Sequence, residues 1–458
     1  MQNILKKPVA LFVAVAIAGC AAANGTTPSL SGGSSTGGGP AFRAHGKGAK
    51  NPTVFTVVRN RILLNGKTFF IKGVDYAPTQ ICAASGSASS YPLSDTNAAI
   101  WGPDLAAMQK LGVNVVKVYN VGTTSSGAPV AMGKFLAAAY KRHIYTILSI
   151  WIPPGIIDNG QHPNGVKAIA SQYYQLANTY GANPDVMGIS IGGEWNQHPP
   201  VSNAPTWTQG VNPIIQQAWG GLINAGVGNA KILTTTLEND LTGTYAQTTM
   251  GEGEANGFPP TPKPTGKPFY GATAEFAWGF DIYSGLTPTL AYVKAHNPKR
   301  PLIVAEWGEP AGYHPNPRGS PTIVQEWPSA TVSTLTNYIT AHAQTIYNNS
   351  TVLHPNSGVD SGSFYFEWSD EYWKAYGANP SPSPAPYCAH IGGLNGINPN
   401  PSSGFPSGFD DESWFGLNAV ATPSPAPTSS ANPTPSAGVD IMLQRPNFTT
   451  LKAAWAQE

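Results

Sequence analysis

The chain has 458 residues, of which only 11% are charged, and its formal net charge is +1. Its length allows one large domain or two ordinary ones. The near-neutral charge and the lack of a basic stripe argue against nucleic acid as a partner. The 50 Gly and 43 Pro indicate many turn-rich loops, while the 12 Trp and 19 Tyr supply aromatic faces for core packing or ligand binding.

The N-terminus has the pattern of an export signal. Lys6 and Lys7 precede an apolar stretch at 9–17 that is too short to span a bilayer as a helix. Residues 17–20, Ile-Ala-Gly-Cys, resemble a bacterial lipobox, in which Cys20 becomes the lipidated first residue. We therefore expect residues 1–20 to be a lipoprotein signal peptide and the protein to be exported from a bacterial cytoplasm and anchored to the cell envelope. An ordinary signal peptide, cleaved a few residues later, is the alternative.

The cysteine count fits this interpretation. Assigning Cys20 to a lipid leaves two cysteines, Cys82 and Cys388, in an oxidising compartment. They could form a disulfide that ties the loop after the first predicted strand to the loop after the last, or they could be two unrelated buried thiols. Residues 21–50 are rich in Gly, Ser, Thr and Ala, which is typical of a flexible tether. The folded domain is predicted to occupy residues 51–458.

Strand and helix patterns alternate along this domain. Residues 55–64 and 67–69 predict a short hairpin with Asn65-Gly66 as its turn. Strands are then predicted at 70–76, 113–119, 144–152, 186–192, 231–237, 277–283, 301–305 and 362–366. Helices are predicted at 103–111, 129–143, 167–180, 213–225, 289–295, 330–348 and 451–455.

Eight strands that alternate with helices predict an α/β fold, a (β/α)8 TIM barrel with long rim loops and the short hairpin at its N-terminus. A doubly wound sheet, the competing fold, would be expected to show a Gly-rich phosphate loop after its first strand, and the sequence has none. In a barrel the carboxyl ends of the strands meet on one face, where the chemistry sits.

Two glutamates carry the functional prediction. Glu194 follows the apolar run 189–191 and Glu306 follows the run 301–305, and each is followed by Trp. A carboxylate at the end of a buried strand is costly unless something requires it there. A pair of carboxylates at two strand ends is what cleavage of a glycosidic bond requires, one as proton donor and one as nucleophile or base. The simpler alternative for each is a salt-bridged residue on the barrel rim.

The chain also resembles a known family. Residues 69–78, FFIKGVDYAP, and 111–119, LGVNVVKVY, are similar to the start of the β-1,3-glucanosyltransferases of glycoside hydrolase family 72. Family 2 and family 5 barrels share parts of this pattern. The resemblance implies a retaining barrel enzyme with the acid/base, Glu194, on the fourth strand and the nucleophile, Glu306, on the seventh.

The resemblance implies two further roles and shows two departures. Tyr283 matches the tyrosine that hydrogen-bonds the nucleophile, and Trp368 matches the aromatic floor under the sugar. The clan usually has Asn directly before the acid/base, where it contacts the sugar 2-hydroxyl; this chain has Gly193. Asn196 and Asn120 are the candidates for that contact. The clan often has Arg on the second strand near the nucleophile, and the matching residue here is Lys117, which keeps the charge but lacks the planar fork.

The remaining site predictions come from residues at or near strand ends. The predicted substrate-binding set is Tyr76, Lys117, Tyr119, Asn120, Trp151, Trp195, Asn196, Tyr283, Trp307, Glu367 and Trp368. Trp195 and Trp307 are expected to exclude water and raise the pKa of the acid. Secondary candidates are Glu238, Asp370, Glu371 and His198. Of these, Asp370 and Glu371 are more typical of residues on the barrel rim. No cluster has metal-ligand spacing, so no metal and no cofactor is predicted.

These features predict a retaining glycoside hydrolase or transglycosidase that acts on a β-linked polysaccharide, with β-glucan or β-mannan as the leading substrates. Its two carboxyl groups should lie about 5–5.5 Å apart. Two other functions fit the same sequence: a non-catalytic carbohydrate-binding barrel at the cell surface and an assembly partner for an exopolysaccharide export machine.

Overall fold

The structure is a computed structural model, and the residues that it describes are 53–81, 91–124, 127–152, 156–157, 163–197, 210–238, 249–251, 253–254, 275–296, 300–316, 324–374, 405, 409, 411–421 and 439–458. The predicted signal peptide with Cys20, the tether, the two other cysteines (Cys82 and Cys388) and His198 lie outside these residues. The predictions about them therefore stay predictions.

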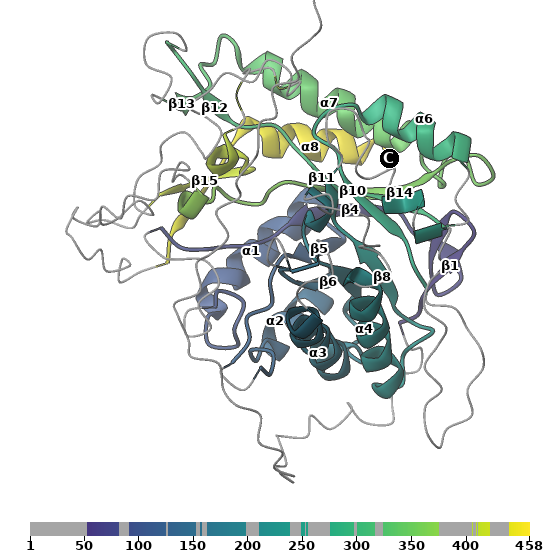
Figure 1. The fold of residues 1–458 in the computed structure, drawn as a ribbon. Helices are drawn as coiled ribbons and strands as arrows, with labels where there is room; N and C mark the ends of the chain where they lie inside the picture. The colour runs from purple at the N-terminus through teal and green to yellow at the C-terminus, as the bar shows by residue number, and fades with distance from the viewer. Residues whose placement is uncertain are drawn as a thin grey trace, which may run out of the picture.

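A parallel barrel forms the centre of the molecule (Figure 1). The sheet has the strand order β8-β7-β6-β5-β4-β14-β11-β10-β9. Only Thr236 separates β8 (Ile232–Thr235) from β9 (Leu237–Glu238), so these two segments are one barrel strand, and the sheet closes with eight strands. The other seven are β4 (Ile71–Asp75), β5 (Val115–Val118), β6 (Tyr145–Ile150), β7 (Val186–Ile191), β10 (Trp278–Asp281), β11 (Leu302–Trp307) and β14 (Asp360–Tyr365). The predicted fold class is confirmed.

Helices follow the strands and cover the outside of the barrel. In Figure 1, α2, α3 and α4 lie on one side of the strands and α6, α7 and α8 on the other. Their bounds are α1 Ala98–Leu111, α2 Gly133–Tyr140, α3 Pro163–Tyr180, α4 Asn212–Asn224, α6 Leu286–His296, α7 Val332–Asn348 and α8 Pro446–Ala456. Within the described part of the chain, none of the helices combines the length and the apolar character that crossing a membrane requires.

Helix α1 shows where the boundary prediction was wrong. It begins at Ala98, five residues before the predicted start at Pro103, which lies inside the helix. Pro usually begins a helix because it lacks an N–H to donate, but here it costs one hydrogen bond in a helix that Trp101 and Leu105 anchor in the core. The predicted end at Gly112 is confirmed, since this residue adopts a left-handed conformation with φ 98°.

Short sheets surround the barrel. The predicted hairpin is a three-stranded meander of β1 (Phe55–Val58), β2 (Arg61–Leu64) and β3 (Lys67–Thr68), because the first run turns back at Arg59, where φ is 58°. The predicted turn at Asn65-Gly66 is confirmed, with positive φ at both residues. The remaining short elements, which were not predicted, are β12 (Gly312–Tyr313), β13 (Gln325–Glu326), β15 (Asn418–Ala421), β16 (Ile441–Gln444) and the 3-10 helices η2 (Trp195–Gln197), η4 (Tyr372–Lys374) and η6 (Glu412–Trp414).

Side chains alternate between the barrel interior and the helix layer, as the strand pleat requires. The interior cluster at the lower end consists of Phe55, Ile62, Ile71, Val115, Ile147, Met187, Ile232, Ala277, Ile303 and Phe364. Neighbours along the strands, such as Val116 and Val304, pack instead into the larger cluster under the helices. This alternation decides which strand-end residues point into the mouth of the barrel.

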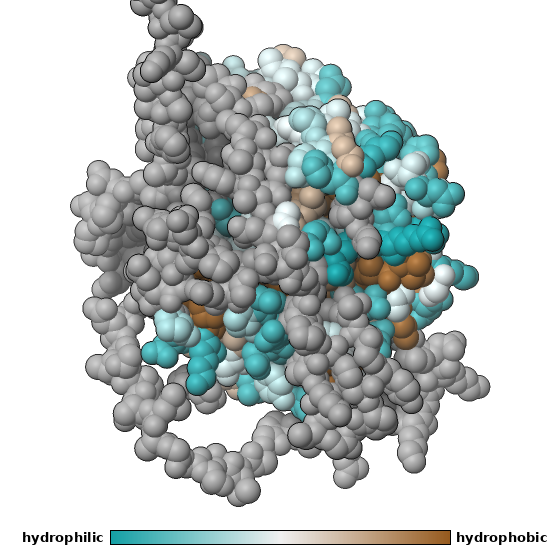
Figure 2. Space-filling view, turned by 45° about the vertical axis from the view of Figure 1, so that its right-hand side comes forward, coloured by the Kyte–Doolittle hydropathy of each residue, from teal (hydrophilic) through white to brown (hydrophobic). Residues whose placement is uncertain are grey.

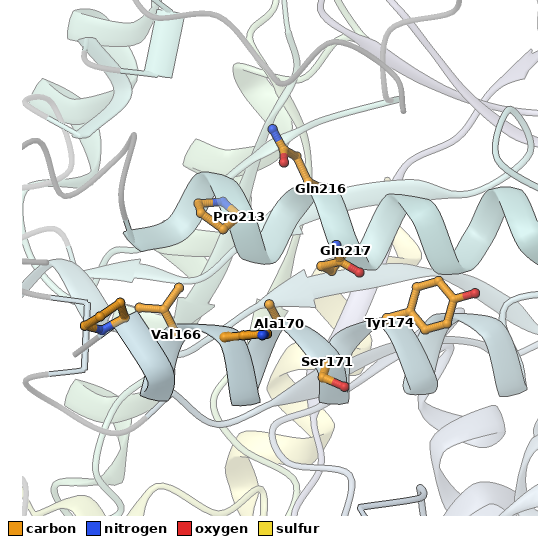
Figure 3. A pocket seen from close by; sticks show the side chains of 9 residues that line it. Val166, Ala170, Ser171, Tyr174, Pro213, Gln216 and Gln217 are labelled. Atoms are coloured by element: carbon orange, nitrogen blue, oxygen red, sulfur yellow. The ribbon is translucent and has the colours of Figure 1, made fainter. Parts of the chain in front are cut away.

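The described surface offers little apolar area. On the face that Figure 2 shows, hydrophobic residues occur in small groups among hydrophilic ones. A groove of about 520 Å³ runs between α3 and α4 (Figure 3), lined by residues that include Lys167, Ser171, Tyr174, Gln216 and Gln217. It lies between two helices on the outside of the barrel, away from the strand-end carboxylates, and is not the predicted site.

Gly362 offers a test of how the first and last barrel strands meet. It has φ +115°, and a Cβ added there would lie 2.3 Å from the backbone N and O of Ile71, its partner in β4. We expect Gly362→Ala to lower the free energy of unfolding by about 3 kcal/mol or more. Gly102→Ala is the matched control, because a Cβ at this helical position meets no atom within 4 Å; it should be neutral or stabilising by up to about 1 kcal/mol. Chemical denaturation measures both, and equal stabilities would contradict the close approach.

Candidate active site

Acidic side chains converge at the carboxyl ends of the barrel strands. They come from five different strands or the residues just after them, and they are Asp75, Glu194, Glu238, Asp281 and Glu306. One carboxylate oxygen from each of Glu194, Asp281 and Glu306 lies within 4.8 Å of the other two. The two predicted catalytic glutamates are therefore neighbours in space, as the barrel prediction required.

Glu306 is held by three donors. Its Oε1 accepts from the Lys117 ammonium at 3.2 Å and from the Tyr119 hydroxyl at 2.6 Å, and its Oε2 accepts from the Tyr283 hydroxyl at 2.7 Å. A positive charge and two charge-assisted hydrogen bonds hold this buried carboxylate in one orientation. The geometry agrees with the predicted contact of Tyr283 with the nucleophile and places Lys117 and Tyr119 against the same group.

A register shift turns Glu306 toward the interior. Val304 pairs with Phe280, but Glu306 pairs with the next residue, Asp281, so β11 carries one extra residue, Ala305. Without this bulge, strict alternation from the interior residue Ile303 would point position 306 at the helices. The displaced Ala305 carbonyl accepts a hydrogen bond from Lys117 at 2.8 Å.

Lys117 is the cation at the centre of this cluster. Its Nζ lies 3.3 Å from Asp75 and 3.2 Å from Glu306, and only 2% of its side chain is exposed. Burial lowers its pKa, but Asp75 and Glu306 raise it by more, so the ammonium stays charged. Lys117 therefore acts behind the nucleophile, as the predicted substitute for Arg, and contacts no solvent-facing surface.

The chain reaches Glu194 through two glycines. Gly192 has φ 68°, and a Cβ there would collide with Trp195 and Ile152, so only glycine fits. Glu194 itself has φ 47°, and its backbone N–H donates to the Thr236 carbonyl at 2.9 Å. This fixed bend points the side chain of Glu194 back over the barrel mouth, toward Glu306.

Glu194 is suited to be the proton donor. Burial raises its pKa well above the usual range, and Glu238, Asp281 and Glu306 raise it further. A carboxyl among other carboxylates keeps its proton to higher pH, which a general acid needs. The closest oxygens of Glu194 and Glu306 lie within 4.8 Å, a separation that fits retention of configuration better than the about 6.5–9.5 Å of inverting enzymes.

Two predicted aromatic residues face the helices instead of the mouth. The Tyr76 hydroxyl donates to Asp104 at 2.7 Å, and its ring stacks on Phe135. The Trp307 indole donates to Ser363 at 3.0 Å, and its ring stacks on His342 of α7. Each directly follows a residue that points inward, Asp75 and Glu306, so the pleat turns it outward. These contacts do not support their prediction as substrate-binding residues.

Trp195 and Trp368 are also displaced from their predicted places. Trp195 is buried in η2, where its indole donates to the Ile191 carbonyl at 3.2 Å. Trp368 lies beyond the end of β14 and packs edge-on against Phe448 of α8. Neither side chain lies over the catalytic carboxylates, so the water-excluding role predicted for Trp195 and the floor role predicted for Trp368 are not supported.

Phe366, which the sequence analysis missed, occupies the place expected for the aromatic floor. Its ring meets Tyr119 and Tyr283 edge-on, both at 6.0 Å between centroids. Alternation along β14 gives the reason: Phe364 is in the interior cluster, so Phe366 points the same way. Strand alternation counted from Phe364 would have identified Phe366. The family resemblance pointed instead to Trp368, two residues further along the chain.

Two other predicted residues, Asn196 and Asn120, support the mouth from behind. Asn196 exchanges two hydrogen bonds with the backbone of Glu238, at 2.9 and 2.8 Å, and so fixes β9 beside the acid. The Asn120 side chain accepts from the Trp151 backbone N–H at 3.2 Å and joins the ends of β5 and β6. These contacts assign Asn120 and Asn196 to shaping the site, and the half-buried Trp151 stays a candidate for contact with substrate.

Glu367 belongs to a separate buried group. It lies next to Glu371 and Lys374, and only 1% of it is exposed. Burial raises its pKa, and Glu371 raises it further. The Lys374 ammonium sits 4.5 Å from the centre of the Phe366 ring, so this group lies behind the aromatic floor. The predicted contact of Glu367 with sugar hydroxyls is not supported.

Carboxylates as close as those of Glu194, Asp281 and Glu306 raise the question of a bound cation. Both oxygens of Glu306 already accept hydrogen bonds from Lys117, Tyr119 and Tyr283, and the ammonium supplies the positive charge. Among the described residues, the Lys117 ammonium is therefore the cation that compensates this cluster.

Removal of the central cation should depend on pH in a defined direction. We expect Lys117→Met to lower the free energy of unfolding by about 3–5 kcal/mol at pH 7, because Asp75 and Glu306 lose their buried partner. The loss should be smaller at pH 5, where carboxyls with raised pKa, such as Asp75 and Asp281, take up protons. Lys110→Met, at an exposed position in α1, is the control. Thermal unfolding at the two pH values measures the effect, and an equal loss at both would contradict the assignment.

Comparison with known proteins finds a family match over the first part of the chain. The profile of the glucanosyltransferase family, glycoside hydrolase family 72, matches residues 47–216. The 1,3-beta-glucanosyltransferase gel2 from two strains of Aspergillus fumigatus is 28% identical over 165 residues, which is 34% of this chain and 32% of the relative. The chain thus matches about a third of the length of these curated relatives.

Solved structures extend the likeness of the fold over most of the chain. A family 2 β-galacturonidase from Eisenbergiella tayi superposes with a TM-score of 0.50 at 11% identity, over 89% of this chain and 54% of that one. Bacteroides uniformis β-glucuronidase 2 gives the same TM-score and identity, over 89% of this chain and 37% of that one. The chain thus has the fold of a (β/α)8 barrel, and its residues 47–216 are similar to the family 72 glucanosyltransferases, the resemblance stated from the sequence.

Proposed function

We propose that this protein is a retaining β-glycosidase that cleaves a β-glucan and passes the cleaved chain to water or to a second sugar. One observation carries the proposal: a carboxyl with raised pKa, Glu194, lies within 4.8 Å of a carboxylate that three donors hold, Glu306. One proton donor and one nucleophile at this separation are the components of double displacement.

In the first step Glu306 attacks the anomeric carbon, and the bond from that carbon to the leaving oxygen breaks. Glu194 delivers its proton to the leaving oxygen, and a covalent glycosyl ester on Glu306 results. Lys117, Tyr119 and Tyr283 keep Glu306 oriented for the attack. In the second step Glu194, now ionised, removes a proton from water or from a sugar hydroxyl, whose oxygen displaces Glu306.

The substrate proposal rests on the curated relatives. Their name specifies 1,3-β-glucan and a transfer reaction, and the matched region includes Lys117, Tyr119 and Glu194. The match ends before Tyr283 and Glu306, and their place in the site comes from the barrel geometry. We therefore propose 1,3-β-glucan first, with other β-glucans and β-mannan as alternatives, and transfer ahead of hydrolysis.

Product analysis tests the reaction. Reduced and unreduced laminari-oligosaccharides should give both longer and shorter products with the parent, and proton NMR should show retained β-configuration. Glu306→Ala should lower the rate by about 10⁴-fold or more, because no covalent intermediate can form. Glu194→Ala should cleave only aryl glycosides that need no protonation of the leaving group, and added azide should restore its rate by accepting the glycosyl group.

The matched control is Glu458→Gln, which removes a carboxylate that pairs with Lys72 at 3.7 Å, outside the site. This variant should keep the parent's product pattern. If only shorter products form, the reaction is hydrolysis and not transfer. If the parent forms no products from any glucan or mannan but still binds the polysaccharide, the proposal of an enzyme is wrong and the carbohydrate-binding barrel is favoured.

We also propose that the protein acts at the cell envelope through a lipid at Cys20, as the lipobox-like residues 17–20 suggest. The parent, expressed in a bacterium, should sediment with membranes and carry a diacylglyceryl group on Cys20 by mass spectrometry. Cys20→Ala should move the protein to the soluble fraction or leave its signal uncleaved. A parent that is soluble and begins several residues after Cys20 would identify an ordinary signal peptide. Peptide mapping of the same material without reductant would test the predicted Cys82–Cys388 disulfide.

A further inference from the structure

Asp281 is a third carboxyl at the centre of the site, and neither the resemblance nor the predicted mechanism gives it a role. It ends β10 directly opposite Glu306, and alternation from the interior residue Ala277 points it into the mouth together with Tyr283. Only 1% of it is exposed, and neither of its oxygens has a hydrogen-bond partner among the residues that the structure describes. A buried polar group with no partner is costly unless a ligand supplies one.

The charges around Asp281 favour its neutral form. The titratable groups that face it from the neighbouring strands are Asp75, Lys117, Tyr119, Glu194, Glu238, Tyr283 and Glu306. Lys117 is the single cation among them, and it already contacts both Asp75 and Glu306. An ionised Asp281 would add a negative charge within 4.8 Å of the nucleophile without a cation of its own. Burial raises the pKa of Asp281, and Glu306 raises it further.

A neutral carboxyl has the hydrogen-bonding capacity of an amide. Its hydroxyl donates and its carbonyl accepts, as the N–H and C=O of an Asn side chain do. The amide that normally contacts the sugar 2-hydroxyl in this clan is missing here, because Gly193 stands in its place. Among the residues that the structure describes, a Cβ added at Gly193 meets no atom within 4 Å.

We propose that Asp281, as the neutral acid, hydrogen-bonds the 2-hydroxyl of the sugar at the cleavage point and so replaces the amide that Gly193 lacks. This inference rests on the proposed function. The 2-hydroxyl sits on the carbon next to the one that Glu306 attacks, and Asp281, which lies within 4.8 Å of Glu306, is close enough to that position to reach it. A contact to this hydroxyl strengthens as the transition state forms, and it contributes to rate as well as to binding.

The test compares two substrates and three enzymes. Aryl β-laminaribioside, and its analogue without the 2-hydroxyl on the ring next to the aryl group, are offered to the parent, Asp281→Asn and Asp281→Ala. Removing a transition-state contact of this kind should cost Asp281→Ala about 100-fold in kcat/KM on the intact substrate. On the 2-deoxy analogue the same variant should lose less than about threefold, because the contact no longer exists there. Asp281→Asn should stay within about tenfold of the parent on both.

A pH profile separates the neutral from the ionised acid. If Asp281 is neutral, Asp281→Asn removes no charge, and the alkaline limb of kcat/KM, which reports Glu194, stays in place. If Asp281 is ionised, its removal lowers the pKa of Glu194, and the limb moves to lower pH. The control is Asp104→Asn, a buried aspartate that bonds Tyr76 on the helix side; it should leave the ratio of the two substrates unchanged.

Unfolding measurements give a readout that needs no activity. A carboxyl whose pKa is raised in the folded protein costs stability as the pH rises above its unfolded value. The melting temperature of Asp281→Asn should therefore rise relative to the parent between pH 5 and pH 8, by several degrees. A constant difference, a shifted alkaline limb, or equal losses of Asp281→Ala on both substrates would each overturn the inference. A parent that turns over no substrate would instead defeat the proposed function, while the melting curves would still report the charge of Asp281.

Discussion

The site depends on one buried ammonium. Lys117 lies between Asp75 and Glu306 and donates to the carbonyl that the bulge at Ala305 exposes. Without it, the interior of the barrel mouth would hold several carboxylates and no compensating charge, and a buried charge without a partner is among the most costly arrangements in a protein. The cation contacts Glu306 directly, while burial raises the pKa of the neighbouring carboxyls Asp75, Glu194 and Asp281. A single lysine thereby gives two groups of one cluster different environments, which the proposed division into nucleophile and acid requires.

Both regular strand segments and irregular backbone determine the direction in which these side chains point. On β5, uninterrupted alternation from Val115 brings Lys117 and Tyr119 inward. On β11 the same alternation would have failed, and the extra residue at Ala305 corrects it. At Glu194 the correction is made by a left-handed bend that begins at Gly192. The nucleophile and the acid both owe their direction to departures from ideal strand geometry, which is common near active sites.

The sequence predicted the barrel and the two glutamates, because long apolar periodicities and strand-end carboxylates are local signals. The tyrosine beside Glu306 came from the family resemblance. The prediction for Tyr76 and Trp307 is not supported, because strand alternation beside Asp75 and Glu306 decides the direction of a side chain. That signal was available for Tyr76, since Ile71, Gly73 and Asp75 alternate without interruption. The bulge at Ala305 leaves no mark in the residue types, so Trp307 could not have been excluded from sequence. Asp281 was missed because its partners come from other strands.

Thr236, the single residue that interrupts the fifth barrel strand, contacts both Glu194 and the lysine beside Glu306. Its carbonyl accepts from the backbone of Glu194 at 2.9 Å, and its hydroxyl lies 3.5 Å from the Lys117 ammonium that holds Glu306. The proposed acid and the cation beside the proposed nucleophile are thus joined through one residue of the barrel wall, so a substitution at Thr236 alone should disturb the surroundings of both.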